Sequence, residues 1–287
     1  MSRSYEEIVA LVRDTLVQAG STFREDKKDA YKSAIEKEDN ARAKWVLETI
    51  LENARTAEEN RSPLCDDTGI PHLVLEVGPH AAVSGEMLQA IQEGVAQGLR
   101  TLPGRPMGIR GDDSARIDQS GGLDEDSGAV LPAPILLRPC EEDAVRLHVL
   151  MFGGGPAIRA KTYRIFHKHS VETVLDEIVD WSVEGVRQLG CSPCTLAVGI
   201  GRSHYEAASM MLLAQVEGDH RRQSAMEAEI TRRVNEADIG PLGLHGRTSV
   251  LATFLKVGSQ RASGVRIVCV RPACCFEPRI ASVELTD

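Results

Sequence analysis

The sequence contains seven cysteines, the residues with the most chemistry to offer. Five of them lie in segments rich in Gly and Pro: Cys65, Cys191, Cys194, Cys274 and Cys275. An odd number of cysteines in a chain of 287 residues argues against a disulfide framework. Since three separate loops each offer thiolates, the pattern favours one metal cluster assembled from distant parts of the chain. Cys140 and Cys269 lie in or beside strand-like runs, where we expect small buried side chains.

The pair Cys191 and Cys194 has the C-x-x-C spacing of half a zinc site or of a redox pair. A zinc ribbon needs a second pair at matching spacing, which the adjacent Cys274 and Cys275 do not supply. A thioredoxin-like pair should follow a strand and begin a helix, whereas this pair follows a predicted helix. Both alternatives fit less well than a cluster.

Two carboxylates follow directly after a candidate thiolate, in the loop Arg61 to Gly69. Asp66 and Asp67 could simply cap a turn, which is common for this residue pattern. Beside a Lewis-acidic metal, a carboxylate could instead transfer a proton to or from carbon. The hypothesis from the residues is therefore acid–base chemistry next to a metal.

Three consecutive glycines, 153 to 155, follow a predicted strand. Glycine lets a ligand approach the backbone closely, so we expect Gly154 and Gly155 to contact the substrate, although the glycines could also just end a hairpin. They lack the following Lys and Ser/Thr of a phosphate loop, which excludes that mode of nucleotide binding.

The elements that must position these residues are helical first and mixed afterwards. Apolar residues recur at helical spacing through the first sixty residues, which we interpret as scaffold, and again from Val171 to Leu189. A further helix, capped by Ser84, should run to about Leu102. Strands are expected at 70–77, 135–138, 145–152, 196–200, 250–257 and 265–270, with 135–138 and 145–152 as antiparallel strands joined by a charged turn. Residues 103 to 130 have no periodicity. The predicted class is α+β: a helical N-terminal region, 1–60, and then a mixed α/β part, within one domain over 1–287.

Charge and composition restrict the partners. The net charge is −9, which repels nucleic acids and anionic membranes and favours a small-molecule ligand or a protein partner. We find no secretion signal and no apolar run long enough to span a membrane, so the sequence predicts a cytoplasmic protein.

Five motifs together resemble the iron–sulfur subunit of class I fumarases and L-tartrate dehydratases over nearly the whole chain. In chain order they are PLCDDTG at 63–69, GGG at 153–155, GCSP at 190–193 with VGIG at 198–201, GPLGL at 240–244, and a cysteine near 274 followed by Arg279. The resemblance implies a hydro-lyase, the α subunit of a pair whose separate β subunit completes the active site, often as an α2β2 assembly.

The resemblance also implies the roles of individual residues. A 4Fe-4S cluster would be held by Cys65, Cys191 and a third cysteine, with one iron left open for substrate. Spacing from GPLGL slightly favours Cys274 as the third ligand, whereas spacing back from Arg279 permits Cys275. Asp67 would be the acid–base group of this subunit. Arg105 would contact a substrate carboxylate. Asp66 would also contact the substrate, at a position where the family usually has Gln.

Departures from the family pattern leave the substrate open between tartrate-like and malate- or fumarate-like acids. Residues 156–159, Pro-Ala-Ile-Arg, are closer to the tartrate branch. Gln260 replaces a His of the family, and the acidic stretch 124–128 replaces an Asn-Thr-Gly segment. A noncatalytic cluster-binding or sensing homologue is the alternative hypothesis, and a zinc-binding module is a more distant one.

Overall fold

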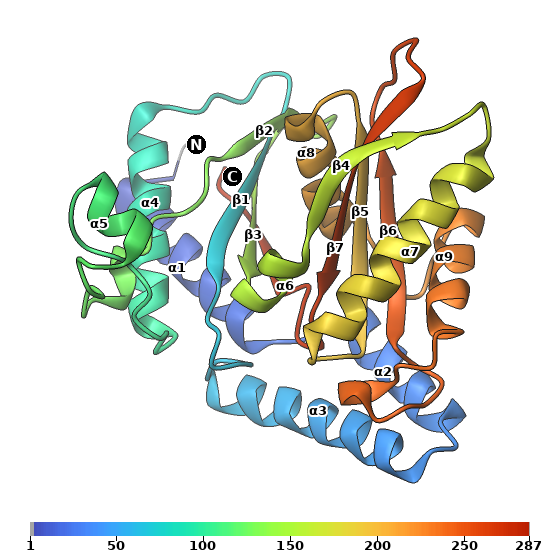
Figure 1. Ribbon diagram of the computed structural model, residues 1–287. Coiled ribbons are helices and arrows are strands. Elements are labelled where there is room, and N and C mark those ends of the chain that lie inside the picture. The colour runs from blue at the N-terminus through green and yellow to red at the C-terminus, as the bar shows by residue number, and fades with distance from the viewer. Residues whose placement is uncertain (1–2, 287) are drawn as a thin grey trace. The chain divides into compact units, whose positions relative to one another are not determined.

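The computed structural model describes residues 3–286, and the chain divides into two compact units that are each assembled from separate stretches. Unit 1 comprises Met1–Thr22, Ala54–Gly153 and Arg279–Asp287, whereas unit 2 comprises Phe23–Asn53 and Gly154–Pro278. The boundary at residues 53 and 54 falls inside the helix α3 (Ala41–Asn60). Each unit contains one four-stranded sheet (Figure 1). The predicted α+β class is confirmed, and the single domain over 1–287 stays a prediction.

Unit 1 is a mixed sheet with two long helices packed on it. Its strands are β1 (Ile70–Val77), β2 (Leu136–Pro139), β3 (Val145–Phe152) and β8 (Ile280–Glu284), in the order β2-β1-β3-β8. Its helices are α1 (Tyr5–Ser21), α4 (Gly85–Thr101) and the short α5 (Asp113–Asp118), with one 3-10 turn at Ser127–Ala129. The last two elements lie in the segment 103–130, where the sequence showed no periodicity.

Strands β2 and β3 do not form the expected hairpin. β1 lies between them. Its second half pairs with β2 in parallel, and its whole length pairs with β3 in antiparallel orientation. A parallel pair needs a crossover connection, and α4 lies in the stretch of chain between β1 and β2. The charged turn after β2 therefore passes the end of β1 and leads into β3. β2 and β3 run in opposite directions but do not pair with each other.

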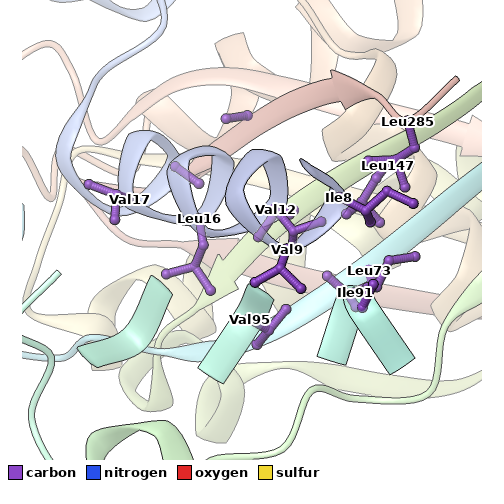
Figure 2. Packing of buried hydrophobic residues seen from close by; sticks show 14 of the residues in the cluster. Ile8, Val9, Val12, Leu16, Val17, Leu73, Ile91, Val95, Leu147 and Leu285 are labelled. Carbon is purple, nitrogen blue, oxygen red and sulfur yellow. The ribbon is translucent and has the colours of Figure 1, made fainter. Parts of the chain in front are cut away.

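The core of unit 1 lies between its sheet and the helices α1 and α4. Ser4 begins α1 with a capping box to Glu7. Figure 2 shows side chains of α1 and α4 meeting those of β1 and β3 in one apolar cluster. Alternate strand residues, such as Leu73 and Leu75, face this cluster and are fully buried.

The close packing of α4 on α1 depends on a glycine. A Cβ at Gly94 would lie 2.6 Å from Val12 Cβ and 2.8 Å from the Val9 carbonyl oxygen. We expect Gly94→Ala to lower the free energy of unfolding by about 1–3 kcal/mol, because overpacking outweighs the gain in helix propensity. Gly85→Ala is the matched control, since a Cβ at Gly85 meets no atom within 4 Å. Denaturant unfolding of both variants measures the difference, and equal midpoints would contradict this packing.

Unit 2 is a second mixed sheet, in the order β4-β7-β5-β6, with helices on both faces (Figure 1). The strands are β4 (Lys161–Phe166), β5 (Cys194–Gly201), β6 (Val250–Val257) and β7 (Val265–Ala273). The helices are α2 (Glu25–Lys37), α6 (Gly154–Arg159), α7 (Val171–Leu189), α8 (His204–Glu217) and α9 (Ala225–Asn235), with one 3-10 turn at Pro241–Gly243. α7 and α9 share an apolar core with one face, and α8 packs on the other. Every residue of β5 is therefore buried.

Most predicted elements of unit 2 are confirmed, including α7 with the predicted bounds and β6 with its full length. The edge strand β4 was not predicted, because its side chains are mostly exposed and do not alternate. None of the helices among residues 3–286 combines the length and the apolar character that crossing a membrane requires.

Candidate active site

In unit 1, the loop from Leu64 to Gly69 carries Cys65 and Asp67 and is fixed at both ends. The Leu64 amide donates to the Gly20 carbonyl oxygen at 2.9 Å, and the Leu64 side chain is buried. Arg279, from the C-terminal stretch, donates from Nη1 to the Asp67 carbonyl oxygen at 2.7 Å. Arg279 is itself 3% exposed, so this contact anchors the loop to the interior of the unit.

Gly69 makes the approach of Arg279 possible. Its φ of +89° is a conformation that side chains other than glycine rarely adopt. A Cβ at this position would also lie 2.6 Å from Arg279 Nη2 and 2.9 Å from the Phe152 carbonyl. The glycine that ends the PLCDDTG motif therefore leaves room for the arginine that holds Asp67.

Asp66 and Arg105, both predicted to bind substrate, contact each other in unit 1. Arg105 Nη1 lies 2.9 Å from Asp66 Oδ2, and the two side chains are 51% and 85% exposed. The Arg105 amide also donates to the hydroxyl of the buried Thr68 at 2.8 Å. The structure thus brings Arg105 to the loop that carries Cys65, Asp66 and Asp67. The guanidinium is already paired with a carboxylate there.

In unit 2, three of the sequence motifs meet around the loop after α7. Gly190 turns the chain with a φ of +77°. Ser192 donates from its hydroxyl to the Gly240 carbonyl at 2.7 Å and accepts from the Leu242 amide at its own carbonyl. The Cys275 amide then donates to the Cys191 carbonyl at 2.8 Å. GCSP, GPLGL and the C-terminal cysteine pair therefore form one hydrogen-bonded group.

The thiols of this group differ in exposure. Cys191 is exposed, whereas Cys194, Cys274 and Cys275 are buried. A hydrogen bond with Cys274, together with burial, raises the pKa of the Cys275 thiol well above its ordinary value, and Cys191 contributes in the same direction. Cys194 and Cys274 both belong to the apolar core of unit 2, and burial raises the pKa of Cys194.

The candidate ligands are divided between the two units. Cys65 belongs to unit 1, and Cys191, Cys274 and Cys275 belong to unit 2. Within residues 3–286, no three His, Cys, Asp or Glu side chains lie together as a metal-binding group. The donor set nevertheless suits iron–sulfur chemistry, since the thiols come from Gly/Pro loops whose backbones are held by hydrogen bonds.

The remaining predicted residues lie in unit 2. Gly154 and Gly155 are the first residues of α6, and a Cβ at Gly155 would meet nothing within 4 Å. Gln260, which replaces the family's His, donates to the Gly258 carbonyl at 2.9 Å.

Sequence reasoning missed four residues that hold the two loops. Thr68 and Arg279 lie inside quoted motifs, but nothing in their type marks them as loop anchors. Lys27 and Tyr31 lie in α2, which was interpreted as scaffold, and they contact the loop after β7. Their near-complete burial would have been the signal, and the sequence does not reveal it.

A comparison with known protein families identifies the family of this chain. A family model described as fumarate hydratase (Fumerase) matches residues 9–284. The chain therefore belongs to the fumarate hydratase family, and it is a hydro-lyase. The family predicted from the five motifs is confirmed.

The relatives that this chain matches over most of its length include α subunits. It is 24% identical to a putative L(+)-tartrate dehydratase subunit alpha of Methanocaldococcus jannaschii, over 92% of this chain and 94% of that one. The L(+)-tartrate dehydratase subunit alpha of Escherichia coli is 22% identical, over 92% of this chain and 87% of that one. A putative class I fumarate hydratase of Geobacillus stearothermophilus is 27% identical, but the match covers 90% of this chain and 50% of that protein.

Proposed function

We propose that this chain is the cluster-bearing subunit of a hydro-lyase that adds water to, or removes it from, a small dicarboxylic acid. One observation carries the proposal most directly: the Cys275 amide donates to the Cys191 carbonyl, so two predicted ligand loops lie side by side in unit 2. The remaining proposed ligand, Cys65, lies in unit 1 on the anchored loop that also carries Asp67.

The ligands that we propose for a 4Fe-4S cluster are Cys65, Cys191 and Cys275. One observation favours Cys275 over its neighbour Cys274. The Cys275 amide donates a hydrogen bond to the Cys191 carbonyl oxygen at 2.8 Å. Cys274, in contrast, belongs to the apolar core together with Cys194. This choice reverses the slight preference for Cys274 that spacing from GPLGL gave.

When bound, such a cluster supplies Lewis acidity to the hydroxyl that leaves or enters. The protein's own residues exchange the proton and bind the carboxylates of the substrate. We assign to the Asp67 carboxylate the exchange of a proton at the substrate carbon, with Arg279 fixing the backbone of its loop. Arg105 binds a substrate carboxylate, for which it must exchange its contact with Asp66. We propose that the backbone at Gly154 and Gly155 contacts the ligand; a Cβ at Gly155 would meet nothing within 4 Å.

A β subunit would complete this active site. The putative class I fumarate hydratase of Geobacillus stearothermophilus is matched over 50% of its length, so that relative carries a further part of similar size beside the matched one. The two α-subunit relatives match over most of their length, as expected for one member of a pair. We propose that the β subunit supplies the second acid–base group, and that the assembly is α2β2.

The substrate class is a small hydroxy-dicarboxylic acid, either tartrate-like or malate- or fumarate-like. The printed functions of the relatives include both L(+)-tartrate dehydratase and fumarate hydratase. The noncatalytic alternative is favoured by one observation, the ion pair that occupies Arg105. Turnover by the two-subunit protein distinguishes the two proposals.

Anaerobic reconstitution tests the cluster directly. We expect about four irons per chain and a broad sulfide-to-iron absorption at about 400 nm. With its β subunit, the loaded protein should turn over tartrate or fumarate under anaerobic conditions. Stoichiometric zinc without iron would exclude the cluster, and a loaded complex inert toward both acids would support the noncatalytic alternative.

A further inference from the structure

Helix α2 contacts the loop that carries Cys275, although the two are far apart in the sequence. The Tyr31 hydroxyl donates to the Cys275 carbonyl oxygen at 2.7 Å. Lys27 donates from Nζ to the Glu277 carbonyl oxygen at 2.6 Å. Lys27 and Tyr31 are one helical turn apart, and the two carbonyls are two residues apart, so one face of α2 holds both.

Both donors are removed from solvent. Tyr31 is 0% exposed and Lys27 is 1% exposed. The partner of the Tyr31 hydroxyl is a carbonyl oxygen, which can only accept, so the phenol acts as the donor. Leaving a buried charge or hydroxyl without its acceptor is costly, so these contacts constrain the loop strongly.

An aromatic group fixes the two donors in place. The Phe23 ring stacks on Tyr31 with 5.7 Å between centroids, and Lys27 Nζ lies 4.3 Å from the centroid of the same ring. The ring of Phe276, within the loop, lies 6.1 Å from the Phe23 ring, measured between centroids. The loop therefore contacts α2 through its backbone, and it contacts Phe23, which precedes α2, through the Phe276 side chain.

The remainder of the loop is fixed by its own residues. Glu277, fully buried, forms an ion pair with Arg271 at the end of β7. The Glu277 amide also donates to the Cys274 carbonyl at 2.9 Å. The backbone of residues 274–277 is thus held from β7 on one side and from α2 on the other, while Cys275 reaches Cys191.

We propose that Tyr31 and Lys27 are positioning residues that hold Cys275 beside Cys191 for cluster binding. The inference rests on the proposed function, because it concerns the cluster-binding loop. If α2 only supported the fold, it would have no effect on how long the cluster is retained. The proposal gives it such an effect. Hydrogen-bond partners that orient metal ligands typically affect metal affinity by about 10- to 100-fold.

Tyr31→Phe and Lys27→Met test the proposal, since each removes a donor and keeps most of the packing volume. Tyr163→Phe and Lys32→Met are the matched controls, because Tyr163 and Lys32 are exposed. Each protein is loaded anaerobically, and the loss of absorption at about 400 nm is followed with an iron chelator. We expect loss about tenfold faster or more in the two test variants and unchanged loss in the controls.

A second readout does not require the cluster. In the apo chain, alkylation of Cys275 by iodoacetamide, measured by mass spectrometry, should be faster in Tyr31→Phe than in wild type. The measurement is made far below the unfolding midpoint of each variant. A general loss of stability would accelerate alkylation of Cys194 and Cys269 as well, whereas loop release should affect Cys275 selectively.

The outcomes separate the two proposals. If wild type takes up about four irons and both test variants retain them as long as wild type does, the positioning role is wrong and the cluster stands. If wild type binds no iron, the proposed function fails. If Lys27→Met does not fold, Tyr31→Phe carries the test, and wild-type alkylation in that variant would overturn the inference.

Discussion

Replacing Asp67 by asparagine should lower turnover by a factor of at least about 100 while iron content stays that of wild type. The amide keeps the shape of the side chain but cannot accept a proton from carbon. The backbone contact of residue 67 with Arg279 uses the carbonyl oxygen, which the substitution leaves in place. Turnover, iron content and unfolding midpoint are measured on one preparation of the two-subunit protein.

A turn-capping role for Asp67 gives the opposite result. Removing a cap lowers stability by about 1 kcal/mol, so the midpoint would fall while activity per folded molecule stayed near wild type. Asp66→Asn is a useful comparison, because Asp66 is the neighbouring carboxylate and is paired with Arg105. We expect it to change the Michaelis constant rather than to abolish turnover. Full activity in Asp67→Asn would remove this residue from the mechanism.

Serine in place of Cys275 should abolish cluster binding, whereas serine in place of Cys274 should leave most of it. The reason is structural: the Cys275 amide donates a hydrogen bond to the Cys191 carbonyl, and Cys274 lies in the apolar core. Cys65→Ser and Cys191→Ser should also lose the absorption at about 400 nm. Iron per chain after anaerobic reconstitution is the measurement.

Cys140→Ser is the control for these cysteine variants. Cys140 follows β2, where its thiol lies 3.3 Å from the Glu142 carbonyl oxygen, so we expect wild-type iron content. The reverse pattern, with iron lost in Cys274→Ser and kept in Cys275→Ser, would contradict the assignment and restore the preference derived from spacing. Circular dichroism of each apo variant shows that the fold is retained.

The sequence predicted elements well where one strong periodicity decides the structure. α7 carries a wide apolar stripe, and β5 is a short apolar run covered on both faces. The pairing of β2 was not predictable in the same way, because its partner is β1, and α4, α5 and a 3-10 turn lie between the two strands in the chain. The exposed edge strand β4 lacks the alternation that marks a half-buried strand.

The sequence points to the candidate functional residues by their type, but it does not reveal the residues that hold their loops in place. Loops rich in Gly and Pro contain Cys65, Asp67, Cys191 and Cys275. The sequence therefore indicates them as candidate metal ligands and as a candidate acid–base group. Lys27 and Tyr31 stand in an ordinary polar helix, and lysine is a residue type that is rarely buried. Only tertiary contacts distinguish a lysine that holds a loop from one that is solvated.

The discontinuous make-up of unit 1 has a consequence for the order of events during synthesis. Arg279 follows Asp67 by 212 positions, so at about 5–20 residues per second the ribosome reaches it roughly 10 to 40 s later. Throughout that interval the Cys65 loop lacks its anchor, and β8 is absent from the edge of its sheet. The N-terminal thiol of the proposed cluster therefore emerges well before its binding geometry exists. We therefore expect the proposed cluster to be inserted only after translation of the C-terminal stretch.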